Sequence, residues 1–209
     1  MRGTFVLAAI VFLLAIPVIA AQTESKNELG LMLGGTVTPN LAIAGSGSGS
    51  LNIGTGTTLQ LNYARRLMKA RSLGLYFEIP ALAIPQQTIG TSVGAAPKNY
   101  DSFFVTPSLR AMLRPAAAFS PWFSAGGGYA LFDESARRTD GTPNIHGTSG
   151  GAVQFGGGVD IRTPIRVLFP IGVRLEVRDL YTSKPNYHVD TGGGFQHNLV
   201  FSGGLVLRF

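Results

Sequence analysis

The sequence contains no cysteine and little charge. Without cysteine, its 209 residues offer no disulfide framework, no thiolate metal site, no cysteine nucleophile and no lipoprotein anchor. Charged residues make up 13% of the chain, whereas about 25% is usual in soluble domains. This composition argues against a typical cytosolic enzyme. With 45% hydrophobic residues the chain is also too apolar for a disordered tail.

Long apolar runs are absent too, apart from one near the N-terminus. Residues 5–16 are apolar or small and follow a positively charged start. This run is shorter than the ~20 residues that a helix needs to cross a bilayer. Small residues follow it, in the pattern of a secretory signal peptide. We therefore expect residues 1–21 to be a signal peptide, cleaved near Ala20 or Ala21, and residues 22–209 to be an exported domain without a helical anchor.

The exported part is dominated by an alternation of apolar and polar residues. In residues 171–178 the odd positions are all isoleucine, valine or leucine, and the even positions are glycine or charged. A period of two indicates a strand with one apolar and one polar face. Similar segments, each near the ~9–11 residues of a tilted membrane strand, cover 28–37, 57–67, 73–79, 102–113, 122–132, 154–162, 171–178 and 199–209.

The links between these segments alternate in length. Three short links, at 68–71, 115–120 and 163–166, alternate with four long polar or glycine-rich ones, at 38–56, 80–101, 133–149 and 182–195. Outer-membrane barrels have short periplasmic turns and long outer loops, whereas a soluble sandwich has no reason to alternate in this way. We therefore predict an all-β fold, an eight-stranded antiparallel up-and-down transmembrane β-barrel.

With these features the sequence resembles the eight-stranded outer-membrane β-barrel family, the group of OmpA- and OmpX-like domains. The resemblance spans residues 28–209 and includes the chain end, where alternating apolar residues finish on an aromatic one. It implies a bacterial outer-membrane location, contact with outer-membrane lipids and insertion by the barrel-assembly machinery. Leu205, Leu207 and Phe209 would form the C-terminal assembly signal. None of these motifs is a catalytic signature.

The polar faces of the strands predict a filled interior. Eight strands enclose a lumen just wide enough to be filled by side chains, and an unpaired charge buried there would be costly. We expect an interior charge network made of Glu28, Arg66, Glu78, Arg110, Asp160, Arg162, Arg174, Glu176 and Arg178. A narrow ion channel, detectable as conductance, is an alternative.

The sequence has 17 basic and 11 acidic residues. The excess of basic residues is expected at the end of the barrel with the short links. Basic residues there suit the headgroups of anionic lipids, and no basic stripe indicates nucleic-acid binding. Aromatic residues such as Trp122 near the same rim suggest a girdle at the membrane interface. The long loops at the other end are expected to meet an unknown extracellular partner, since loops on a rigid scaffold commonly carry binding.

The histidines offer the main argument for an enzyme. His146, His188 and His197 lie in or beside the long loops, and none has the His-x-Ser spacing of lipid A deacylases. We expect no catalytic, cofactor or metal site, because no nucleophile is indicated and no spacing is typical of a metal site. A lipid-modifying enzyme that uses a histidine as general base near Ser183 or Ser202 is the first alternative.

Two further hypotheses concern the sheet itself. Pro80 is expected to end the third segment and Pro107 to interrupt the fourth, since proline cannot donate to a β-ladder. One hypothesis is that both prolines lie on one locally weakened seam, similar to barrels that admit lipid sideways. The alternative for these prolines is a β-bulge at Pro107 and a strand end at Pro80. The other alternative is a soluble periplasmic barrel, similar to a lipocalin, with its apolar face inward. The main prediction is a membrane barrel with a structural or cell-surface interaction role.

Overall fold

The computed structural model describes most of the chain after residue 24. The described residues are 25–43, 49–91, 96–135, 137–138, 140–143, 147–166, 170–187, 190–192 and 194–209. The expected signal peptide, residues 1–21, lies outside them. Across these ranges there is no helix with the length and apolar character needed to cross a bilayer.

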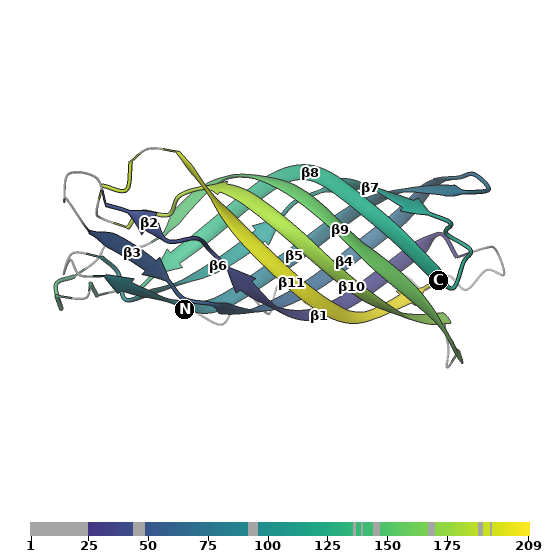
Figure 1. Ribbon diagram of the computed structural model, residues 1–209, viewed down its shortest axis with the longest axis horizontal. Coiled ribbons are helices and arrows are strands. Elements are labelled where there is room, and N and C mark those ends of the chain that lie inside the picture. Colours follow the sequence, from purple (N-terminus) through teal and green to yellow (C-terminus); the bar gives the residue numbers. More distant parts are fainter. Residues whose placement is uncertain are drawn as a thin grey trace.

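The chain forms one antiparallel sheet that closes into an elongated barrel (Figure 1). Its strands are β1 (Asn27–Val37), β2 (Leu41–Ala42), β3 (Ser50–Ile53), β4 (Gly56–Lys69), β5 (Leu73–Thr91), β6 (Asn99–Val105), β7 (Ser108–Leu113), β8 (Phe119–Glu134), β9 (Thr148–Arg166), β10 (Pro170–Ser183) and β11 (Phe195–Arg208). The strands β6 and β7 follow each other between β5 and β8, so that the ring has eight strands. The short strands β2 and β3 extend the wall at the end with the long loops.

The ring is closed by its first and last strands. The pairing of β1 with β11 runs from Glu28 opposite Arg208 to Val37 opposite Leu199. In lipid every backbone polar group must be satisfied within the protein, which requires such closure. The predicted eight-stranded up-and-down barrel is therefore confirmed.

The alternation of side chains decides which face meets the membrane. Outward-facing side chains such as Leu31 and Phe123 are 68% and 60% exposed, whereas the inward-facing Arg174 is 1% exposed. The polar face therefore lines the lumen and the apolar face lies outside. This orientation is the reverse of that in the lipocalin-like alternative, which the structure does not support.

The sheet extends further toward the long loops than the alternation predicts. Most of the predicted loop 80–101 is sheet, because β5 continues to Thr91 and β6 begins at Asn99. Pro80 lies inside β5, where it faces Asn62 of β4. The expectation that it ends a strand was wrong. Residues 81–84 are apolar on both faces, so this part of β5 shows no alternation in sequence.

Each of the two prolines removes one hydrogen bond from a different ladder. The amide of Thr106 donates to the carbonyl of Pro80 at 3.2 Å, and that of Gly127 donates to the carbonyl of Pro107 at 3.1 Å. Residues paired in this way normally exchange two bonds, and proline provides only the acceptor. The losses thus fall on the β5 side and the β8 side of the break between β6 and β7. The hypothesis that both prolines weaken one seam was wrong.

Candidate functional site

The lumen near the short turns is filled by a network of ionisable side chains, which we call the charged half. All members are at most 8% exposed. Four carboxylates and four guanidiniums contribute, so their formal charges cancel. They are Glu28, Glu78, Asp160 and Glu176 together with Arg110, Arg174, Arg178 and Arg208.

Arg174 is held by two carboxylates. Its Nε and Nη2 donate to Oδ1 and Oδ2 of Asp160 at 2.7 and 2.8 Å, and Nη2 also donates to Oε2 of Glu28 at 3.1 Å. The two parallel bonds to Asp160 form the bidentate pair that the planar guanidinium favours. Glu28 also accepts a bond from Arg110. These contacts join β1, β7, β9 and β10 across the lumen.

Two more arginines complete the network. Arg178 donates from Nε to Glu176 at 2.7 Å and from Nη2 to Glu78 at 2.6 Å. Arg208 donates from Nη2 to Oδ2 of Asp160 at 2.6 Å and from Nε to Oε1 of Glu28 at 3.1 Å. Since residues 28 and 208 come from the first and last strands of the ring, the network also ties the closing seam together.

Trp122 lies in the middle of the charged half. Its Nε1 donates to Oδ1 of Asp160 at 3.0 Å, and its ring centre lies 5.2–5.6 Å from three guanidinium carbons. These are distances of favourable cation–π contact. Trp122 is 4% exposed, so its predicted place in a membrane girdle was wrong. Gly158 makes room for it, because a Cβ there would lie 2.7 Å from Cζ2 of the indole.

The structure brings together seven of the nine residues predicted for the network. Arg66 and Arg162 are the exceptions, because both lie at the short-turn rim. Arg162 is exposed and donates to the carbonyl of Pro115, and Arg66 is at a β-bulge near the end of β4. The predicted network omitted Arg208 and Trp122. Both lie at even positions, as the other inward residues do, and this parity was the available signal.

The lumen near the long loops is filled by apolar side chains, which we call the apolar half. Phe104, Phe132 and Tyr100 pack edge to face, with ring centres 5.8 and 6.1 Å apart. Segments outside the ring contribute as well, including β3 and the β10–β11 connection. The buried members are Ile43, Leu51, Ile53, Leu82, Ile84, Ile89, Ala96, Tyr100, Phe104, Ala130, Phe132, Ala152, Leu180, Tyr187 and Val200.

Neutral polar side chains separate the two halves. Gln154 accepts from Thr106 at 2.8 Å and donates to Ser124 at 3.0 Å. On the opposite wall the hydroxyls of Thr36 and Thr58 are 2.5 Å apart. These residues are at most 3% exposed. Side chains therefore fill the described lumen from the short turns to the long loops.

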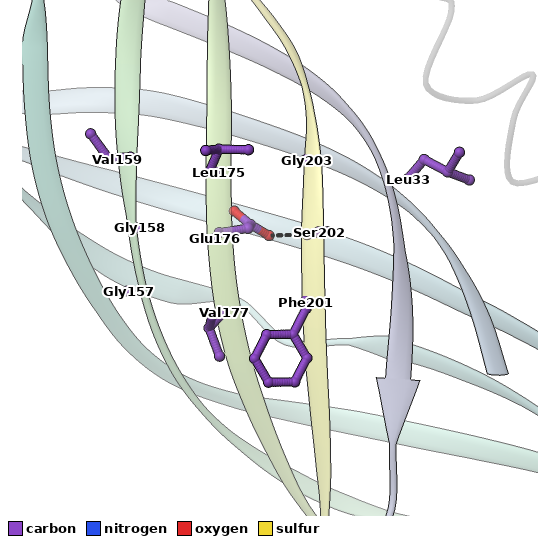
Figure 2. Close-up of a pocket in the computed structure, with 10 residues that line it drawn as sticks. All are labelled: Leu33, Gly157, Gly158, Val159, Leu175, Glu176, Val177, Phe201, Ser202 and Gly203. Carbon is purple, nitrogen blue, oxygen red and sulfur yellow. Dashed lines mark hydrogen bonds between the residues drawn. The ribbon is translucent and has the colours of Figure 1, made fainter. Parts of the chain in front are cut away.

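The outer wall carries a shallow apolar groove of about 420 Å³ over β9, β10, β11 and β1 (Figure 2). Two of its lining positions, Gly157 opposite Val177 and Gly203 opposite Leu175, provide no side chain. Glu176 lies on the same strand as Leu175 but points into the barrel, where it accepts a bond from Ser202 at 3.3 Å. The groove is part of the lipid-facing wall and has no catalytic feature.

A histidine and a carboxylate meet on the outer face near the long loops. Nδ1 of His197 lies 2.7 Å from Oδ2 of Asp179, and its ring lies 4.8 Å from that of Tyr181. Ser202 faces the lumen and cannot serve His197 as a nucleophile. His146 and His188 lie outside the described residues. Within the described ranges no three histidine or acidic side chains are placed to hold a metal ion.

The predicted assembly signal ends the last strand. Leu205 faces outward and is 53% exposed. Phe209 exchanges two backbone bonds with Asn27, at 2.9 and 3.0 Å. The residues of the predicted assembly signal therefore lie at the closing seam of the ring. Their role in assembly stays a prediction.

No protein-family model matches this sequence, and neither does any curated protein sequence. Among solved structures, Neisserial surface protein A (NspA) is similar, with a TM-score of 0.59 and 11% identity over 90% of this chain and 100% of that one. Outer membrane protein AlkL, solved in lipid bilayers, has a TM-score of 0.50 and 15% identity over 93% and 95%. At these identities the likeness shows the fold, which is that of eight-stranded outer-membrane barrels.

Proposed function

We propose that this protein is a closed barrel of the bacterial outer membrane that acts through its long-loop end as a structural or surface-interaction component. The observation that carries the proposal is the filled lumen, in which four carboxylates neutralise four arginines. A charge-balanced network without an open path stabilises the wall and does not conduct ions. Function then falls to the parts that reach beyond the membrane.

The long-loop end has the construction expected of a binding platform. The apolar half anchors β3 and Tyr187 of the β10–β11 connection to the inside of the wall. Tyr187 also donates to Gln196 at 2.8 Å, and burial raises the pKa of its phenol well above the usual range. Anchoring of this kind preorganises the described segments β3 and Tyr187, which favours recognition of a partner.

Planar-bilayer recording tests whether the barrel is closed. The purified, refolded protein is expected to show no stable conductance steps at voltages up to 100 mV. A heat-modifiable band on an unboiled gel, from the same preparation, would show that the barrel is folded. Reproducible single-channel steps from folded protein would contradict the proposal and favour the narrow channel.

Surface labelling tests the direction of the barrel in the membrane. A cysteine placed at Gly192, in the β10–β11 connection, is expected to react with a membrane-impermeant maleimide on intact cells. A cysteine at Arg71, in the β4–β5 turn, is expected to react only after the outer membrane is permeabilised. The reverse pattern would place the short turns outside. Edman sequencing of the labelled protein is expected to start at Ala21 or Gln22.

A lipid-modifying enzyme is the second candidate, because of the pair formed by His197 and Asp179. A carboxylate that orients an imidazole is one half of the arrangement that activates a hydroxyl or a water. The pair lies on the outer face, with the histidine side chain 53% exposed. Overexpression would then change the acyl chains of lipid A or phospholipid, as measured by mass spectrometry. The change should disappear in His197→Gln and persist in Lys98→Gln, and an unchanged lipid profile would exclude this candidate.

A further inference from the structure

A basic pocket lies at the short-turn rim, outside the charged half. It has a volume of about 390 Å³ and is formed by the last residues of β4 and the residue before β1. Its lining consists of four cations and two apolar side chains: Lys26, Arg65, Arg66, Leu67, Met68 and Lys69. No step of the proposed function uses it.

A β-bulge explains why these side chains meet. The register of β4 against β5 shifts between Arg66 and Met68, so β4 has one residue more than its partner there. A bulge re-aims the side chains around it. Leu67 and Met68 are consecutive, yet both are exposed, at 57% and 53%. The amide of Arg66 donates to the carbonyl of Lys26 at 2.7 Å, which holds the start of β1 against the bulge.

The outer face of β4 places this pocket at the membrane surface. Toward the short turns its outward residues are Leu59, Leu61, Tyr63 and Arg65, at two-residue spacing. An apolar stretch followed by an aromatic residue and then a cation is the order of a membrane interface. Tyr63 is fixed there by a bond from its hydroxyl to Oδ1 of Asn27 at 3.1 Å. Arg65 therefore lies at the level of the lipid headgroups.

The charge of the pocket favours an anion of lipid origin. Toward this end the charged half contributes Glu28 and Asp160, which are 4% and 0% exposed and are bonded to Arg174 and Arg208. These carboxylates are turned into the lumen, away from the pocket. Guanidinium groups bind phosphate with two parallel bonds, and the two adjacent apolar side chains suit the glycerol and first methylenes of a lipid.

We propose that this pocket binds the phosphate headgroup of an anionic phospholipid, of the phosphatidylglycerol class, in the leaflet next to the short turns. Arg65 and Lys69 would bind the phosphate from the outer wall, and Lys26 would bind it from the start of β1. Leu67 and Met68 would contact the top of the acyl chains. The site is independent of whether the lumen conducts.

Lipid retention tests the site directly. The protein is refolded into equal amounts of phosphatidylglycerol and phosphatidylcholine of the same acyl chains, extracted in mild detergent, and its retained lipid is measured by mass spectrometry. Wild type is expected to retain phosphatidylglycerol over phosphatidylcholine by roughly tenfold or more, since each basic residue at an anionic surface changes binding by about fivefold. The variant Lys26→Gln/Arg65→Gln/Lys69→Gln should retain both lipids equally.

Three controls keep the result interpretable. Arg71→Gln removes a cation from the same rim outside the pocket, and Lys98→Gln removes one from the long-loop end; both should retain the wild-type preference. All variants must show the heat-modifiable band, because the pocket contributes nothing to closing the lumen. Loss of preference in Arg71→Gln as well, or no preference in wild type, would overturn the proposal. So would displacement of the retained lipid by 10 mM inorganic phosphate, which would indicate a site for free phosphate.

Discussion

The two halves of the lumen lie inside the same barrel but are filled by side chains of opposite character, charged in one half and apolar in the other. In the charged half each guanidinium has carboxylate oxygens at fixed distances, such as the 2.6 Å between Arg178 and Glu78. In the apolar half, side chains such as Phe104 and Leu82 pack without directional partners. Removing one partner of a buried charge pair is strongly destabilising, whereas the surroundings of a vacated apolar site can relax in part. We therefore expect the charged half to specify the strand register more strictly, whereas the apolar half packs against β3 and Tyr187 of the β10–β11 connection.

The largest effect is expected from removing one charge in the charged half. Arg178→Met leaves Glu176 without the arginine that binds it at 2.7 Å, so we expect unfolding free energy to fall by about 3–5 kcal/mol. Urea unfolding of the refolded protein, followed by the heat-modifiable band, measures the loss. A loss below about 1 kcal/mol would mean that the charges are solvated. The two halves would then not differ in the way proposed above.

A paired substitution sharpens this result. In Arg178→Met/Glu176→Gln the network keeps equal numbers of carboxylates and guanidiniums. The double variant should therefore be more stable than the sum of the single losses predicts, with a coupling of about 0.5–3 kcal/mol. If the two single losses of unfolding free energy simply added, the neutrality of the network would not contribute to stability.

In the apolar half, Leu82→Ala is expected to cost about 2–5 kcal/mol in unfolding free energy, because Leu82 is fully buried and its removal leaves a cavity. Leu131→Ala is the matched control. Leu131 faces outward and is 45% exposed, so detergent or lipid chains can occupy the vacated space. Equal losses in the same urea assay would indicate that the apolar half is loosely packed.

A smaller loss of unfolding free energy is expected from replacing Gly158, which lies beside Trp122. A Cβ on Gly158 would lie 2.4 Å from the carbonyl oxygen of Leu175 and 2.7 Å from Cζ2 of Trp122. Gly158→Ala should therefore cost about 1–3 kcal/mol and shift the fluorescence of this single tryptophan. A Cβ on Gly157, which faces outward, would make an ordinary contact of 3.6 Å with the carbonyl oxygen of Trp122. Gly157→Ala should leave the fluorescence unchanged, and a shift of equal size would show that the crowding is not specific to the lumen.

The smallest effect is expected from the hydrogen-bonded pair of His197 and Asp179, outside the lumen. The side chains of His197 and Asp179 are 53% and 27% exposed, and exposed pairs contribute about 0.2–1 kcal/mol. His197→Gln should therefore lower the unfolding free energy by no more than about 1 kcal/mol. A loss close to that of Arg178→Met would show that burial does not decide how much a polar pair contributes to the stability of this barrel.

Sequence reasoning was accurate where the alternation was strict. Residues 171–178 predicted both the strand β10 and the inward position of Arg174 and Arg178, because parity along a strand is a local property. It failed where both faces are apolar, as after Pro80 in β5, since no periodic signal then marks a strand. At the rim it placed Arg66 in the network, because the bulge that changes its surroundings leaves no mark in the sequence.

The chain by itself determined the number of spanning segments, their antiparallel order and which face of most strands is polar. These follow from a two-residue period and from link lengths, both of which are local. Only the tertiary structure decided which carboxylate meets which guanidinium, such as Glu28 with Arg208 from the other end of the chain. It also decided that the lumen is apolar near the long loops. The reason is that contacts across a closed barrel depend on the register of all its strands at once, which no single segment specifies.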